Sequence, residues 1–450
     1  MSGSLKNTGL FADPALYAGL SQKILNGSSP WNLSGEFFFK PLYADHPPYF
    51  FIWGSWLMGL IGTHEISARL MGILPALLGI LLLVRGLFYR SKDLGLAVGT
   101  GFLLLTWGHF TRYTFSPYLE APLVLGSVLL LFGALDKNYI KISLGLLVFA
   151  FSKGVLVLIP AGALSLYFLR DRPRFFIIGF TALGALALSL GLWQIFAGTE
   201  SLAVQTYIQK QVLRSFFEGR SLEEGFAPAK GSFFQGLLFY GSNIARYSLP
   251  WFLLWVFGLR TAFKDTNLLI KNLAKLSLWM TLCFLVAFSV SAIHLPHYLH
   301  PVYMFWAPVG FLGLRRFCQK LPTTIAQKLG AFFSKPLSYS LSFVLLGILF
   351  VAVQLVGDPQ SSGPNRGGDF MRLVQTVNRL GPLSTACQGL EIEGNQNDQY
   401  RAESYALWYL RGSKLGRDLP IQFVTEGTQS DQAKMRLTLK GEKFDPSVCF

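Results

Sequence analysis

Five polar segments carry residues that could do chemistry in an otherwise apolar chain. They contain, in order, Asp13, Asp45 with His46, Glu120, Lys153 and His297. A carboxylate can act as a general base, and a lysine can bind a phosphate. Ionisable groups inside a membrane are costly and are usually functional. Each segment also has a purely structural interpretation, so the residue types alone do not decide its role.

The first two segments resemble local structural signals. Asp13 is followed by Pro14, a common way to begin a helix, and Tyr17 lies in the same segment. A helix start is compatible with a chemical role, because a helix N-terminus stabilises an ionised carboxylate. Asp45 and His46 precede two prolines, which cannot continue a helix, so this segment could also be a turn.

The next two segments place charges beside apolar runs. Glu120 lies at the end of a predicted span and Arg112 lies in the same segment. Glu120 is either functional or a side chain that reaches the membrane surface. Lys153 is a lone cation that interrupts the apolar stretch 142–169. A lysine at that depth needs an anionic partner, and a phosphate is a natural one.

Three of the six histidines, His294, His297 and His300, recur at spacings of three residues. A helix would place them roughly on one face. Zinc would need further ligands, and Pro296 interrupts a helix, so a polar lining near the membrane surface is the favoured interpretation. Asp13 and Asp45 could hold a divalent cation, but carboxylates alone fit many ions. The sequence contains no phosphate-binding loop, nucleophile elbow or paired-cysteine motif.

The elements that position these residues must be membrane spans. Only 14% of the residues are charged and 52% are hydrophobic, whereas a soluble domain has about 25% charged residues. This composition excludes a soluble fold and predicts an all-α polytopic membrane protein. The net charge of +15 first suggests nucleic acid. However, the basic residues cluster in short loops between apolar runs, so no nucleic-acid partner is expected.

The apolar runs predict about ten crossings. The stretch 142–169 is interpreted as two short helices that meet at one face of the membrane, at Lys153. Residues 49–62 span only about 21 Å as a helix, against roughly 30 Å of hydrocarbon, so they predict an interfacial or re-entrant helix. The remaining runs are predicted spans at 66–84, 94–110, 119–135, 175–197, 246–260, 273–292, 297–314 and 337–356.

Loop charges predict which end of the bundle faces the cytoplasm. Five loops are strongly basic and carry only four acidic residues, so the positive-inside rule places them in the cytoplasm. The N-terminus, the loops 111–118, 198–245 and 293–296, and the tail 357–450 are then expected outside. The basic residues are Arg85, Arg90, Lys92, Lys137, Lys141, Arg170, Arg172, Arg174, Arg260, Lys264, Lys271, Lys275, Arg315, Arg316, Lys320, Lys328 and Lys335; the acidic ones are Asp93, Asp136, Asp171 and Asp265.

Three regions follow from these patterns. Residues 1–65 are expected to form an outer-face catalytic loop with interfacial helices, 66–356 the transmembrane bundle with its outer loop 198–245, and 357–450 a small soluble α/β domain outside the membrane. Within the tail, Met371–Leu380 predicts a helix and Ile421–Thr425 a strand. Cys387 and Cys449 could form a disulfide there or remain thiols. Residues 1–12 carry no apolar stretch, so no cleavable signal peptide is expected.

Taken in chain order, these segments resemble the integral-membrane glycosyltransferases of the C-type (GT-C) fold. The nearest branches are the protein O-mannosyltransferases and the lipid A aminoarabinose transferases. The resemblance covers about residues 10–315. The matching motifs are Asp13 with Tyr17, His46-Pro47-Pro48 before an aromatic run, Ser67-Ala68-Arg69-Leu70 with Pro75, Arg112 to Pro122, Lys153-Gly154, Pro250-Trp251, and Leu295 to Pro301.

The resemblance implies inverting transfer of a sugar from a polyprenyl-phosphate carrier to an acceptor hydroxyl or phosphate. The acceptor would be on a protein, lipid A or an envelope glycan at the outer face of a bacterial-type inner membrane. Asp13 matches the family's catalytic aspartate, and Asp45 and Glu120, which fall on further acidic positions of its site, are expected to be catalytic as well. The residues expected to bind substrate are Tyr17, His46, Arg69, Arg112, Lys153, Arg246, His297 and Tyr298. Family members have a span before the aspartate loop, and no apolar stretch precedes Asp13 here.

A transporter or flippase of a lipid-linked envelope precursor is the main alternative. Transporters typically show internal repeats and ionisable residues in the middle of the membrane. This sequence shows no repeat, and its ionisable residues gather toward one side. The pattern therefore favours an enzyme, with membrane lipids and a lipid-linked sugar donor as its partners.

Overall fold

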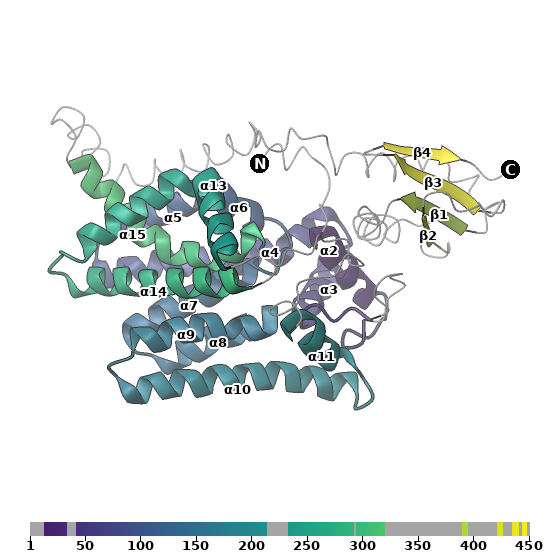
Figure 1. The fold of residues 1–450 in the computed structure, drawn as a ribbon, viewed down its shortest axis with the longest axis horizontal. Coiled ribbons are helices and arrows are strands. Elements are labelled where there is room, and N and C mark those ends of the chain that lie inside the picture. The colour runs from purple at the N-terminus through teal and green to yellow at the C-terminus, as the bar shows by residue number, and fades with distance from the viewer. Residues whose placement is uncertain are drawn as a thin grey trace.

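The computed structural model describes residues 13–33, 42–213, 233–291 and 294–319, together with four strands between 389 and 447. The described part is mainly helical (Figure 1). Its helices are α2 (Asp13–Leu25), α3 (Tyr49–Ile61), α4 (Glu65–Ser91), α5 (Leu94–Thr106), α6 (Gly108–Thr114), α7 (Ala121–Asp136), α8 (Tyr139–Lys153), the 3-10 helix η1 (Gly154–Val157), α9 (Leu158–Tyr167), α10 (Arg172–Ala197), α11 (Ala203–Thr206), the π-helix η2 (Tyr207–Leu213), α13 (Phe233–Ala262), α14 (Leu268–Val290), the 3-10 helix η4 (Pro296–Val302) and α15 (Tyr303–Gln319).

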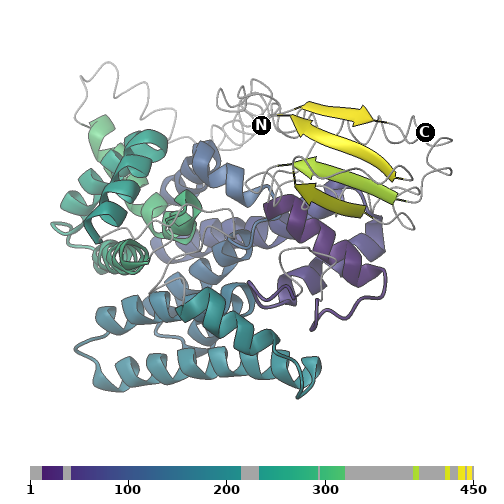
Figure 2. The same cartoon turned by 45° about the vertical axis from the view of Figure 1, so that its right-hand side comes forward.

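Several of these helices are long and apolar enough to cross a membrane. By length and composition they are α4, the continuous run Tyr139–Tyr167, α10 and α14, and the bent pair α5–α6 could supply a fifth span. Large apolar side chains such as Leu81, Phe180 and Val286 are exposed on their outer faces, as expected for contact with lipid. In both views α10 runs along one edge of the bundle (Figure 2). The structure is therefore that of a multi-pass membrane protein, and the count of ten crossings stays a prediction.

The predicted span 94–110 is wrong as one continuous helix. Helix α5 ends at Thr106, Trp107 adopts an extended backbone, and α6 continues at an angle of 78° to α5. The indole of Trp107 is buried against Tyr303 and Trp306 and donates a hydrogen bond from Nε1 to Ser248 Oγ at 3.0 Å. Because this large ring packs between α13 and α15, the helix is interrupted at Trp107 and α6 turns away from the axis of α5.

The helical run 139–167 is interrupted at the predicted position, where the α-helix gives way to a 3-10 helix. Helix α8 ends at Lys153, and Gly154 follows with φ 56° and ψ −113°, a conformation that favours glycine. The chain continues as η1 and α9. The break that the sequence predicts is thus present, and the prediction that it divides two separate crossings is not tested by the helix lengths.

The predicted outer loop 198–245 contains more helix than expected. It includes α11 and η2, and α13 begins at Phe233, well before the predicted span 246–260. Arg246 therefore lies inside a helix of 30 residues rather than at the edge of a loop. The apolar segment 49–62 is a helix, α3, of 13 residues, and it packs against α2 and α4. The predicted span 337–356 lies outside the described residues.

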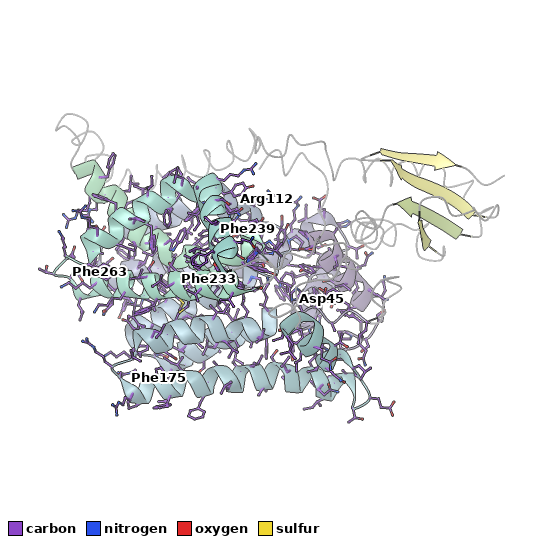
Figure 3. All side chains as sticks on the ribbon, viewed as in Figure 1. Asp45, Arg112, Phe175, Phe233, Phe239 and Phe263 are labelled. Carbon is purple, nitrogen blue, oxygen red and sulfur yellow. The ribbon has the colours of Figure 1, made fainter. Side chains whose placement is uncertain are left out.

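Ion pairs join four of the five basic loops at one end of the bundle. Each pair connects loops that are far apart in the sequence, so these loops must share one end. Phe175 and Phe263 mark the loops 170–174 and 260–275, and both lie at the left of Figure 3, while Asp45 and Arg112 lie to their right. The linking pairs are Arg90 with Asp136, Arg315 with Asp93, and Arg316 with Asp265 at 3.6 Å.

Four strands form a mixed sheet in the C-terminal part of the chain. They are β1 (Gly389–Gly394), β2 (Ile421–Thr425), β3 (Lys434–Lys440) and β4 (Lys443–Ser447), in the order β2-β1-β3-β4. β1 pairs in parallel with β2 and β3, and β4 pairs antiparallel with β3. The predicted strand coincides with β2. The predicted helix Met371–Leu380 and both cysteines of the tail lie outside the described residues, so the extent of an outer domain stays a prediction.

The close packing of α13 on α15 supplies a stability test. Gly258 of α13 lies against α15, where an added Cβ would overlap the backbone oxygen of Val309. We expect Gly258→Ala to lower the free energy of unfolding by about 1–3 kcal/mol, because the two helices must move apart. Gly184→Ala on α10 is the matched control, because no atom lies within 4 Å of its new methyl group. Thermal melting in detergent measures both, and equal melting temperatures would contradict this packing.

Candidate functional site

The centre of the candidate site is an ion pair between two antiparallel helices. Glu120 immediately precedes α7 and Lys153 is the last residue of α8, so the hairpin brings both to the same end. Lys153 Nζ donates a hydrogen bond to Glu120 Oε1. The side chains are only 10% and 2% exposed, respectively. The helix dipoles favour this arrangement, with the anion at an N-terminus and the cation at a C-terminus.

Two residues of the η4 segment complete this centre. His297 Nε2 lies 3.4 Å from Glu120 Oε1. Lys153 Nζ lies 5.0 Å from the ring centroid of Tyr298, close enough for a cation–π interaction. The predicted residues Glu120, Lys153, His297 and Tyr298 therefore form one cluster. Its elements are the two consecutive helices α7 and α8 and the segment η4, which is distant from them in the sequence.

The electrostatics of Tyr118 connect Asp13 to this cluster. Tyr118 is buried beside the ring of His297, with ring centroids 5.7 Å apart. Burial, the neighbouring Tyr113 and the negative charge of Asp13 raise the pKa of Tyr118 well above its ordinary value, and Glu120 adds to the shift. Arg112 acts in the opposite direction. Asp13, at the start of α2, thus lies within electrostatic range of the same ring as Glu120 and Arg112.

The segment that contains Asp45 and His46 lies against both α2 and α8. The ring of His46 contacts Tyr17 of α2 edge-on, with centroids 6.1 Å apart. Three residues further on, Tyr49 stacks on Phe151 of α8 with centroids 4.3 Å apart. Phe151 is two residues from Lys153. The two N-terminal motifs and the lysine therefore belong to one end of the bundle.

The other predicted cations are arranged differently. Arg69 donates hydrogen bonds from Nε at 2.9 Å and Nη2 at 2.5 Å to Glu65 on the same helix, α4. Arg246 is exposed on α13 and lies over the ring of its neighbour Tyr247. Arg112 is also exposed and lies over Tyr113 (Figure 3). These neighbours do not test the phosphate contacts predicted for Arg69, Arg112 and Arg246, which stay predictions.

The three evenly spaced histidines have different surroundings. His297 faces Glu120, whereas His300 Nε2 lies 2.9 Å from Thr114 Oγ1 and connects η4 to α6. His294 packs against Phe239 and Tyr240 of α13. Among the residues that the structure describes, no group of three or more His, Cys, Asp or Glu side chains could hold a metal ion. The polar-lining interpretation fits these contacts.

Two residues near the site were not selected from the sequence. His109 is buried beside Tyr113, and its Nδ1 lies 2.7 Å from the hydroxyl of Tyr303. Tyr207 is buried against the turn that follows Lys153. His109 lies within a predicted span and Tyr207 within a predicted loop. Neither belongs to one of the motifs, and both are connected to the site by contacts over long sequence separations.

The structure was compared with known proteins. No protein-family model matches the sequence. No curated protein sequence matches it. Two solved structures of ArnT from Cupriavidus metallidurans are similar in fold. The apo state has a TM-score of 0.59 at 15% identity and covers 96% of this chain and 89% of that chain. The state bound to undecaprenyl phosphate has a TM-score of 0.61 at 16% identity and covers 97% and 90%. The resemblance to the GT-C-type fold is therefore confirmed, whereas the number of crossings and the outer domain stay predictions.

The buried ion pair predicts a specific stability pattern. Glu120→Gln leaves the Lys153 ammonium buried without its counter-ion, so we expect a loss of about 3–5 kcal/mol in the free energy of unfolding. The double variant Glu120→Gln with Lys153→Met removes both charges and should recover most of that loss. Thermal melting in detergent measures the difference. If the double variant is no more stable than Glu120→Gln, the loss of stability does not come from the unpaired Lys153 ammonium.

Proposed function

We propose that this protein is a polyprenyl-phosphate-dependent glycosyltransferase with the GT-C fold. It moves a sugar from the lipid carrier to an acceptor hydroxyl or phosphate at the outer face of the membrane. The observation that carries this proposal is the buried Glu120–Lys153 pair, beside Tyr118, a ring that both Glu120 and Asp13 influence electrostatically. ArnT is similar in fold, and one of its structures holds undecaprenyl phosphate. This similarity supports a polyprenyl-phosphate carrier for the present protein.

Lys153 is the cation for the leaving phosphate. As the bond between the sugar and the carrier breaks, negative charge develops on the phosphate oxygens, and a fixed cation in a dry site stabilises that charge. An ammonium has three N–H donors, and Glu120 accepts a hydrogen bond from one of them. Glu120 thus holds Lys153 in place and leaves it donors for a second acceptor. Arg112 adds positive charge at the same end.

Asp13 is the general base. An ionised carboxylate accepts the proton of the acceptor hydroxyl as its oxygen attacks the anomeric carbon from the face opposite the phosphate. The new glycosidic bond then has the inverted configuration, and the carrier phosphate leaves with the electron pair of the broken bond. Asp13 and Lys153 lie on different elements, α2 and α8, which suits their roles on opposite sides of the sugar.

The lipid chain of the donor reaches the site along α3. This helix carries exposed Trp56 and Leu60 on the face that does not pack on the bundle. Aromatic and aliphatic side chains on a short helix are typical of a membrane interface. The carrier can therefore remain in the bilayer while its phosphate contacts Lys153. The protein then works as a multi-pass protein of the inner membrane, with this end outside.

Substitution of the base tests the reaction. We expect Asp13→Asn to lower the transfer rate by at least about 100-fold, the usual contribution of a general base, while undecaprenyl phosphate still binds. Asp265→Asn is the control, because Asp265 pairs with Arg316 at the opposite end of the bundle. Purified protein in liposomes is assayed with polyprenyl-phosphate sugars. Near-normal transfer by Asp13→Asn would reject the assignment, and translocation of labelled lipid without transfer would favour a flippase.

The sidedness can be measured with single cysteines. In a variant whose native cysteines are replaced by alanine, Glu200→Cys should react with a membrane-impermeant maleimide in intact cells. Lys264→Cys should react only after the cells are made permeable, because it lies at the basic end. Both positions are exposed. The opposite labelling pattern would place the proposed site in the cytoplasm.

A further inference from the structure

We infer that Tyr207 is a positioning residue for Lys153, an inference that rests on the proposed function. Tyr207 begins η2, 54 positions after Lys153 in the sequence. Its phenol hydroxyl donates a hydrogen bond to the backbone oxygen of Lys153 at 3.1 Å and accepts one from the backbone N–H of Val155 at 2.9 Å. One hydroxyl therefore bridges the two sides of the Gly154 turn.

Gly154 provides the space for this bridge. A Cβ at this position would overlap the hydroxyl oxygen of Tyr207, and the positive φ of 56° also disfavours any other residue. The turn and the phenol therefore fit each other. Because α8 ends at Lys153 and the 3-10 helix η1 begins at Gly154, the backbone hydrogen-bond pattern changes at the lysine. The two hydrogen bonds to Tyr207 add a restraint at this change.

The phenol ring is itself held by the outer segments. Tyr207 is 2% exposed and packs beside Trp193 at the end of α10, with ring centroids 5.8 Å apart. Trp193 Nε1 donates a hydrogen bond to the backbone oxygen of Trp31 at 2.9 Å. Ala44, next to Asp45, belongs to the same apolar cluster. Tyr207 thus connects the segment before Asp45 to the turn that carries Lys153.

This arrangement assigns Tyr207 a role that acts through Lys153. With the hydroxyl in place, the backbone of Lys153 is fixed and its side chain extends to Glu120. Without it, the carbonyl of Lys153 and the N–H of Val155 each lose one hydrogen bond, and the lysine is held less well for the phosphate. The ring packing of Tyr207 is a separate contribution, so removal of the hydroxyl alone isolates the positioning effect.

The test measures the binding of undecaprenyl phosphate to the full-length protein in nanodiscs. We expect Tyr207→Phe to weaken binding about tenfold, the upper end of the effect of one hydrogen-bonding group, with a melting temperature close to that of the wild type. Tyr167→Phe, on α9 at the far side of the turn, is the matched control and should bind as the wild type does. In a Lys153→Ala background, Tyr207→Phe should change the affinity less than twofold, because its effect passes through the lysine.

The outcomes separate this inference from the proposed function. Failure of the wild type to bind undecaprenyl phosphate would reject the proposed function itself. If the wild type and Tyr207→Phe bind undecaprenyl phosphate with equal affinity, only the positioning role is rejected. The same rejection follows if Tyr207→Phe weakens binding equally in the presence and absence of Lys153, or if it weakens binding only in proportion to a lower melting temperature.

Discussion

The ion pair between Glu120 and Lys153 is the interaction on which the site depends. Two charges in an apolar bundle are costly, and their mutual attraction offsets that cost only if they are held close together in a good geometry. The antiparallel hairpin of α7 and α8 holds them at the same level, and the two helix dipoles stabilise the charges there. Under the proposed function, a phosphate that arrives there would meet a cation whose position is already fixed, so little ordering would be needed at the moment of reaction.

The remaining parts of the site are arranged around this pair by aromatic packing. Tyr118 packs beside His297 and lies within electrostatic range of both Asp13 and Glu120, and Tyr49 stacks on Phe151 of α8. Rings suit this position because they fill space in the bundle and also carry polar atoms at their edges. The segments around Asp13 and Asp45 are therefore held by contacts with the bundle.

Part of this arrangement could be predicted from the sequence. Composition and loop charges predicted the class of protein, and the lone Lys153 and terminal Glu120 predicted a polar site because such groups are costly in membranes. The bend at Trp107 could not be predicted, because hydropathy does not register how a large ring packs against α13 and α15. Tyr207 was missed for a similar reason, since its partners lie more than 50 positions away. The early start of α13 was missed because Arg246 and its polar neighbours interrupt the apolar pattern.

The ion pairs at the basic end also bear on biogenesis. Arg90 meets Asp136 as soon as α7 has been made, but Asp93 meets Arg315 only after 222 further positions have been synthesised. Until then, Asp93 caps the start of α5 through the N–H of Leu96 and has no Arg315 to pair with. The ion pair between the start of α5 and the end of α15 can therefore form only after the last described helix of the bundle has been inserted.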